Sequence, residues 1–235
     1  MITNNISNKD QKKHYLGHRE RLRKKFCKSA AMLSDYEILE LFLFHLIPYK
    51  DTKPIAKKLL ETFTTFDGIA MAAEKNLCKI DGIGKLTAFA FKVLGELFTR
   101  RAKNRIKKVN VLDSFEAVLD YCKLNIGYKT QENVHILFLN KQYYLITDEP
   151  LFSGTIDETP FYSREILRKA LELNSSAIIV VHNHPSGDTT PSSADIEQTH
   201  KLLYAAETIG IKLLDHIIVS PNSCTSLRIS NLLKD

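Results

Sequence analysis

The sequence predicts a mixed α/β protein in two parts, an all-helical N-terminal region and a C-terminal domain in which strands and helices alternate. The first observation is charge: residues 1–108 hold 23 Lys and Arg against 11 Asp and Glu, whereas residues 109–235 hold 10 against 16. The net charges are therefore +12 and −6. The second is pattern: after Val109, short apolar runs rich in β-branched residues alternate with helical segments, as in α/β domains. We expect a basic arm over residues 1–30, a helical domain with a basic linker over 31–108, and an α/β domain over 109–235.

The elements of the basic half are predicted from helix-start signals. A Ser followed three residues later by Glu has the spacing of a capping box, and a proline is favoured in the first helical turn. These signals predict helices that begin after Ser34 and after Thr52. Residues 1–30 form either a short helix or a partly disordered arm. A further helix follows Ile80–Phe91 and ends near Arg101, within the basic linker Arg100–Lys108.

The second half is predicted from runs of apolar and β-branched residues, which mark buried strands, and from capped amphipathic segments, which mark helices. We expect strands at Val134–Asn140, Tyr143–Ile146, Ala177–Val181, Leu213–Val219 and Thr225–Ile229. We expect helices at Ser114–Leu124, Phe161–Leu173 and Ser193–Ile209.

Composition excludes several classes of protein. No run approaches the roughly 18 apolar residues that a membrane span needs, and the polar start Met1–Asp10 lacks the apolar core of a secretory signal. The four cysteines are far apart and form no CxxC pair, which argues against a zinc ribbon and against a disulfide framework. Reduced thiols in the cytoplasm are the simple interpretation.

The segment Val180–Asp195, VVHNHPSGDTTPSSAD, carries a metal-ligand pattern. His182 and His184 are two apart at the end of a strand, so alternation puts both imidazoles on one face. Asp195 follows in the first turn of the next helix. Three ligands of this type leave a fourth position for water, as in catalytic zinc sites. The alternative is a polar loop in which Ser192 and Asp195 only cap the helix.

The complete string His182-x-His184-Pro185, six residues, Ser192-x-x-Asp195 resembles the core of the JAMM (JAB/MPN-type) metallohydrolase motif. The residues in detail, HNHPSG…PSxxD, with Arg164–Ile166 before them and Asp215–Val219 after them, resemble the corresponding motif of the RadC family. The resemblance runs from about His18 to Ile229. It implies a JAB/MPN-like, cytidine-deaminase-like fold in the C-terminal half, preceded by a helical helix-hairpin-helix domain.

The resemblance also implies roles for individual residues. His182, His184 and Asp195 would bind one Zn²⁺, and Ser192 would help to hold the tetrahedral intermediate. A glutamate would act as general base through the zinc-bound water. Glu132 stands at the expected place before the first strand, and Glu165 is the competitor.

Two departures from the usual JAMM pattern leave the ligands intact. Asn183 replaces the usual Ser or Thr between the histidines, and Gly187 lies in the following loop. No insertion of the kind that holds ubiquitin in isopeptidases is evident. Asp215 and His216 form either a second layer around the metal or a packed polar pair.

The segment Ile80–Lys85, IDGIGK, resembles the hairpin of a helix-hairpin-helix. Gly82 and Gly84 permit a tight turn whose backbone N–H groups, with Lys85, could face a DNA phosphate. Such contacts would be independent of base sequence and weakened by salt. A plain joint between helices, or a protein-packing element, would use the same residues.

Two functions from different classes follow. The first is a zinc-dependent hydrolase of peptide or isopeptide type, whose peptide or protein substrate the sequence does not identify. The second is a DNA repair or recombination protein that binds DNA through residues 1–108, with a metal site that acts on nucleic acid or is not catalytic.

Overall fold

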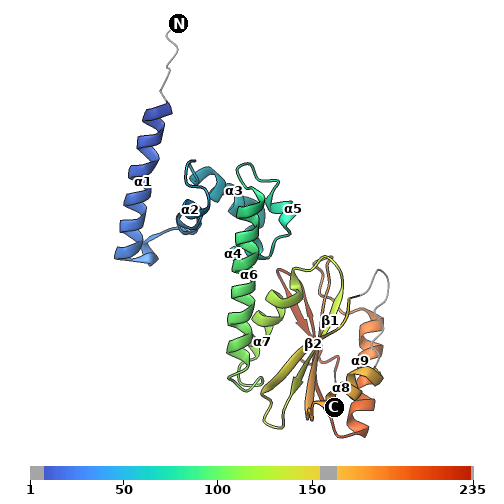
Figure 1. The fold of residues 1–235 in the computed structure, drawn as a ribbon. Coiled ribbons are helices and arrows are strands. Elements are labelled where there is room, and N and C mark those ends of the chain that lie inside the picture. Colours follow the sequence, from blue (N-terminus) through green and yellow to red (C-terminus); the bar gives the residue numbers. More distant parts are fainter. Residues whose placement is uncertain (1–7, 154–162, 234–235) are drawn as a thin grey trace. The chain divides into compact units, whose positions relative to one another are not determined.

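The structure is a computed structural model that describes residues 8–153 and 163–233. The chain forms two compact units, Met1–Gly95 and Glu96–Asp235, and the division falls inside helix α6 (Lys85–Ile106). The first unit is helical, and the second contains a five-stranded mixed sheet with helices (Figure 1). The predicted mixed α/β fold is thus confirmed.

Helices of different lengths make up the first unit. They are α1 (Asn8–Lys28), the 3₁₀ turn η1 (Ala30–Met32), α2 (Asp35–Leu46), α3 (Lys53–Phe63), α4 (Phe66–Met71), α5 (Glu74–Leu77) and the start of α6. The predicted capping signal operates at α2, where Ser34 N–H donates to the Glu37 carboxylate at 2.9 Å. Apolar side chains from α2 to α6 form one core: Leu39, Leu43, Ile55, Ala56, Leu59, Ile69, Leu77, Ile80, Ile83, Ala88 and Phe91.

Helix α1 is attached to the rest of the first unit by partly buried polar contacts. The Arg19 guanidinium donates to the carbonyl oxygens of Ile47, Pro48 and Lys50 at 2.6–2.8 Å, which satisfies the carbonyls that follow the end of α2. His18 Nε2 lies 3.0 Å from the Glu40 carboxylate. Within its described residues, the basic arm is therefore a helix, and the alternative of a partly disordered arm does not apply to them.

The second unit is built around the sheet, in the order β2-β1-β3-β4-β5. Its elements are α7 (Phe115–Cys122), a π-helical turn η2 (Lys123–Gly127), β1 (Asn133–Leu139), β2 (Leu145–Ser153), α8 (Ser163–Glu172), β3 (Ala177–Asn183), α9 (Ser193–Thr208), β4 (Lys212–Val219) and β5 (Cys224–Ser226). Strand β1 is antiparallel to β2 and β3, β3 is parallel to β4, and β4 is antiparallel to β5.

Helices cover both faces of this sheet, α7 on one side and α8 with α9 on the other (Figure 1). Every residue of β1 and β3 is buried, as expected for strands covered on both faces. Alternate residues of β3 point into the two cores: Ile179 and Val181 pack toward α7, and Ile178 and Val180 toward α8 and α9. By the same alternation, His182 projects on the α9 side.

The expected basic linker is largely helical, since α6 continues to Ile106. Ile106 is fully buried in the core under α7, and the Lys103 ammonium pairs with the Asp148 carboxylate of β2. Tyr121 OH and Asn125 Nδ2 also donate to Asp148, at 2.5 and 3.2 Å. The charges of this segment thus join α6 to the sheet. The domain boundaries drawn from the sequence remain predictions.

Strands β2 and β5 differ most from their predicted bounds. Strand β2 extends to Ser153, because it pairs along the whole of β1 and, as an edge strand, tolerates Pro150. Strand β5 stops at Ser226. There the Asp215 carboxylate accepts hydrogen bonds from Ser226 Oγ at 2.5 Å and from Arg228 N–H at 3.1 Å, which turns the chain. The first two residues of the predicted helix Phe161–Leu173 lie outside the described residues.

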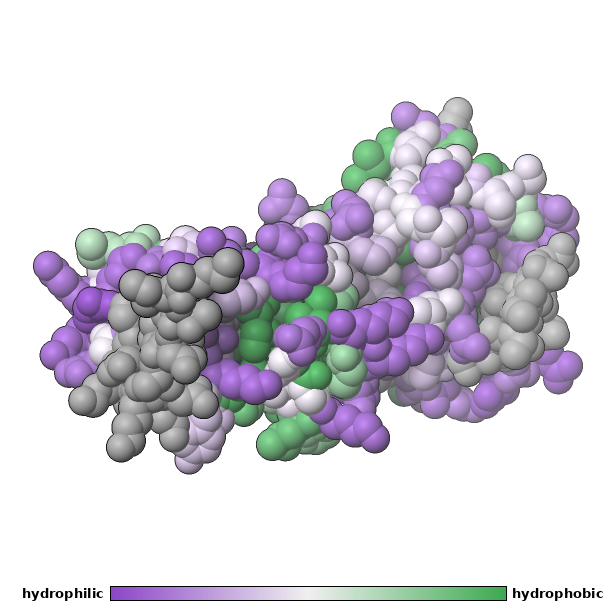
Figure 2. Space-filling view, turned by 90° about the horizontal axis from the view of Figure 1, so that it is seen from above, coloured by the Kyte–Doolittle hydropathy of each residue, from purple (hydrophilic) through white to green (hydrophobic). Residues whose placement is uncertain are grey.

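The surface drawn in Figure 2 is largely hydrophilic, with small groups of hydrophobic residues. Helix α6 exposes Leu86, Phe89, Val93 and Leu97, which follow one another at spacings of three or four and so share one helical face. Among the described helices, none is long and apolar enough to cross a bilayer. All four cysteines are free thiols.

Candidate metal centre

The two histidines converge at the end of β3. His182 is the sixth residue of the strand, and His184 N–H extends the ladder to β4 by donating to Val219 O at 3.0 Å. This pairing keeps the backbone extended, so the two side chains leave the same face of the sheet. Their Nε2 atoms lie 2.8 Å apart.

Asp195 reaches the same point from the first turn of α9. Its Oδ1 lies 3.5 Å from His182 Nε2, and its Oδ2 lies 3.7 Å from His184 Nε2. One ligand atom from each of the three residues falls within 4.8 Å of the others, so the cluster could hold a metal ion. His182 is 6% exposed, but His184 and Asp195 are 15% and 18% exposed. Water can therefore reach the side of the cluster away from the sheet.

Ser192 and Asp195 also form the predicted capping box. Ser192 Oγ accepts from Asp195 N–H at 3.1 Å, and Asp195 Oδ2 accepts from Ser192 N–H at 2.8 Å and from Ser192 Oγ at 2.7 Å. These bonds occupy Oδ2 and leave Oδ1, the oxygen nearer to His182, for a cation. Helix capping and ligation are thus compatible in one carboxylate.

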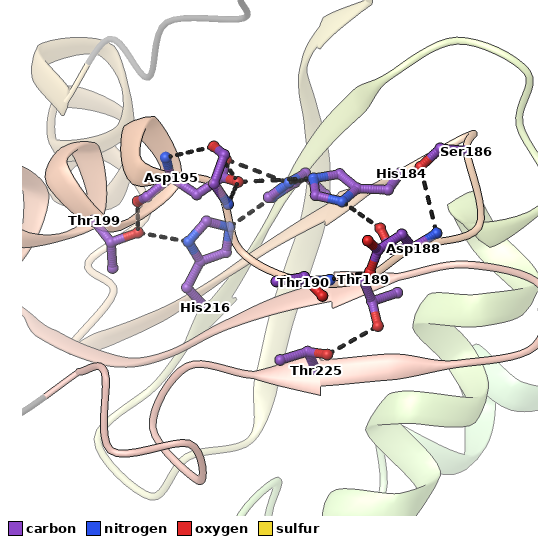
Figure 3. Close-up of polar contacts among 11 residues, drawn as sticks. His184, Ser186, Asp188, Thr189, Thr190, Asp195, Thr199, His216 and Thr225 are labelled. Carbon is purple, nitrogen blue, oxygen red and sulfur yellow. Dashed lines mark hydrogen bonds and ion pairs between the residues drawn. The ribbon is translucent and has the colours of Figure 1, made fainter.

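A chain of hydrogen bonds fixes the tautomers of His216 and His182 (Figure 3). Thr199 Oγ1 lies 2.5 Å from Asp195 O, a carbonyl that can only accept, so the hydroxyl donates there and accepts from His216 Nδ1–H at 2.6 Å. His216 Nε2 then accepts from His182 Nδ1–H at 2.7 Å. This chain of bonds leaves His182 Nε2 without a proton.

His184 is oriented in the same way from the loop. Its Nδ1 lies 2.7 Å from Asp188 O, which requires Nδ1–H and leaves Nε2 bare. Two bare imidazole nitrogens 2.8 Å apart repel unless a cation lies between them, and the facing carboxylate adds negative charge. The donor set therefore fits a divalent cation, and two His with one carboxylate suit zinc.

Burial keeps the imidazoles of His182 and His216 neutral. Desolvation lowers the pKa of His182 to about 4, against the opposing attraction of Asp195, and lowers the pKa of His216 well below its ordinary value. A metal ligand must be the neutral imidazole. His182 is therefore in its ligating form at neutral pH without losing a proton.

A protein-family model described as a RadC-like JAB domain matches residues 112–232. The chain belongs to the RadC family. The match covers the five strands, α7, α8, α9 and all three residues of the metal cluster. The predicted resemblance of the C-terminal half is thereby confirmed.

The predicted general base of this RadC chain lies at the same end of the sheet as the cluster. Glu132 is exposed and directly precedes β1, whose residue Val134 is paired with His182 of the neighbouring strand β3. The competitor Glu165 lies on α8, where it pairs with Arg168 at 3.0 Å on the helix surface. Its pairing matches a structural role within α8.

Sequence reasoning left two possibilities for His216 and missed Thr199. Both side chains are buried, and they connect His182 to the backbone of α9 through the bonds described above. His216 thus supports the cluster, whereas Asp215 bonds to Ser226 and Arg228 and forms a packed polar turn. The signal for Thr199 is its position four residues after Asp195, on the same face of α9.

The hairpin residues lie where the turn after α5 leads into α6. Gly82 has φ +88°, the left-handed conformation that favours glycine, and a Cβ there would meet the Ile55 side chain at 2.6 Å. Gly84 has no neighbour within 4 Å of the Cβ position, and Lys85 is exposed at the start of α6. The turn is therefore tight at Gly82 and open at Gly84.

Proposed function

We propose that this RadC-family chain is a zinc-dependent hydrolase of peptide or isopeptide type. The observation that carries the proposal is the convergence of two unprotonated Nε2 atoms and the Asp195 carboxylate on one water-accessible point. Zinc, when bound there, would polarise a carbonyl group and supply a hydroxide at neutral pH. The preference for an amide bond over a phosphodiester comes from the family and the motif.

The protein residues would divide the remaining work. Glu132 would accept the proton of the attacking water and return it to the leaving amine, which departs neutral. Ser192 Oγ now donates to Asp195; turned toward the substrate, it would donate to the carbonyl oxygen as negative charge develops. The neutral His182–His216–Thr199 chain would hold the site in its ligating form.

Hydrolysis of a fluorogenic peptide library and of isopeptide-linked lysine peptides tests the proposal. Chelation should abolish cleavage and added zinc should restore it. Glu132→Gln should retain the metal and lower the rate by about 10²-fold or more, whereas Glu165→Gln, the matched control, should cleave at the wild-type rate. Cleavage that persists in chelator, or a fully active Glu132→Gln variant, would contradict the assignment.

We propose DNA binding as a second function, located in residues 1–108. The open backbone at Gly84, the exposed Lys85 and the net charge of +12 support a sequence-independent phosphate contact. Fluorescence anisotropy with single-stranded and branched DNA should show affinity that falls as salt rises, and a weaker complex for Lys85→Gln than for the control Lys201→Gln. Affinity insensitive to salt would instead favour protein packing on the apolar face of α6.

The four free thiols suit the cytoplasm as the place of both functions.

A further inference from the structure

Asn183 stands between the two histidines, but its side chain does not join them. It is the last residue of β3, so alternation points it to the opposite face of the sheet from His182. The side chain is fully buried, at 0% exposure. A buried amide needs partners for its oxygen and for both N–H groups, and here each has one.

The partners of Asn183 belong to the segment that leads into β1. Its Oδ1 accepts from Asn133 N–H at 2.8 Å, and its Nδ2 donates to Gln131 O and to Lys129 O, each at 3.1 Å. Because an N–H can only donate and a carbonyl can only accept, these partners determine which side of the amide is oxygen. The arrangement has no alternative orientation.

These bonds hold the backbone on both sides of Glu132. Gln131 O precedes this residue and Asn133 N–H follows it. Asn133 closes the same loop with its own side chain, which donates to Gln131 O at 2.7 Å and accepts from the Lys129 ammonium at 3.2 Å. Within the described part of the chain, the Glu132 carboxylate itself has no hydrogen bond or ion pair. Its location is therefore set by its backbone.

We propose that Asn183 is a positioning residue that holds Glu132 at the metal cluster. The inference rests on the proposed function, in which Glu132 moves the proton. Two consecutive residues of β3 then serve both sides of the sheet: His182 faces the metal, and Asn183 fixes the segment that carries the base. A hydroxyl in its place offers one donor and a shorter reach, so it cannot make all three bonds.

The test uses the full chain loaded with Co²⁺ in place of zinc, whose visible absorption reports the ionisation of metal-bound water. Asn183→Asp retains the acceptor for Asn133 N–H but places an oxygen against two carbonyls. Asn183→Ser is the second variant, in case the aspartate prevents folding. Asn222→Asp makes the same chemical change on an exposed turn residue and is the control.

Both Asn183 variants should keep about one metal per chain and lose about 10- to 100-fold in hydrolysis, because a small misplacement of a catalytic group is that costly. They should shift the pH midpoint of the cobalt spectrum in the same direction as Glu132→Gln. Added to Glu132→Gln, they should change neither the rate nor the midpoint further. The control should match the wild type.

Two outcomes would overturn the inference. Either the effects of the Asn183 variants on rate and midpoint add fully to those of Glu132→Gln, or the metal content falls in the Asn183 variants. Asn183 would then act on the ligands or on the fold. Failure of the proposed function has a different signature, because the wild type itself would then bind no metal or cleave nothing in the presence of metal.

Discussion

Replacing Thr199 by valine should weaken metal binding although Thr199 touches no metal ligand side chain. The substitution exchanges a hydroxyl for a methyl group at a position that is 1% exposed. It removes the acceptor that Thr199 offers to His216 Nδ1–H, 2.6 Å away. If the His216 proton moves to Nε2, the His182 proton must leave Nδ1 for Nε2, the nitrogen that faces the cluster. A protonated Nε2 cannot bind a cation.

The size of the effect follows from the chain of bonds. Loss of an outer partner of a metal-bound histidine costs about 10- to 100-fold in metal affinity, or about 1.4–2.8 kcal/mol. Removing one partner of a buried donor costs about 1–3 kcal/mol, so the metal-free protein should also lose stability within that range.

Two assays separate these effects. Zinc affinity is measured by competition with a chromogenic chelator, and the free energy of unfolding of the metal-free chain by urea denaturation. Thr208→Val is the matched control, because Thr208 also donates to the carbonyl four residues earlier on α9, at 2.9 Å, but is exposed and far from the cluster in sequence. Unchanged zinc affinity in Thr199→Val would refute the tautomer argument.

Three further predictions concern stability. The pKa of His182 is about 4 in the folded chain and near 6.5 in the unfolded chain, so the unfolded chain binds more protons between these pH values. The free energy of unfolding of the metal-free chain should therefore fall by on the order of 3 kcal/mol as the pH drops from 6.5 to 4. A His182→Gln variant whose free energy of unfolding, measured in urea, falls equally steeply with pH would disprove this. Lys103→Met should destabilise the second unit toward the low end of about 3–5 kcal/mol, because it removes the cation beside buried Asp148 while Lys103 itself is one-third exposed. Gly82→Ala should lower the free energy of unfolding by about 1–2 kcal/mol, because alanine disfavours the left-handed φ of this position. Gly84→Ala should lower it much less. Equal losses of stability in thermal unfolding would contradict the conformational argument.

The convergence of His182, His184 and Asp195 was predictable because its geometry is local. His182 and His184 are on one strand, and Asp195 follows after a short loop, so strand alternation and a helix start fix all three. The capping boxes at Ser34 and Ser192 were readable for the same reason: each closes within one helical turn.

The supports of the site were not predictable, because they depend on pairing between distant segments. His216 meets His182 only after β3 and β4 pair in parallel, and Asn183 meets Gln131 only after β1 and β3 pair antiparallel. The same reason applies to the helical end of α6, whose Lys103 finds Asp148 on β2, 45 positions later in the sequence. Charge alone suggested a linker there.

Metal content is the most direct test of the central claim, that His182, His184 and Asp195 form one cation site. Elemental analysis of protein purified without added metal should give about one zinc per chain for the wild type and for Asp188→Ala, a neighbouring exposed aspartate whose backbone carbonyl still holds His184. Asp195→Ala should lose the metal. No zinc in the wild type, or zinc retained in Asp195→Ala, would contradict the account and leave the basic helical half as the better guide to function.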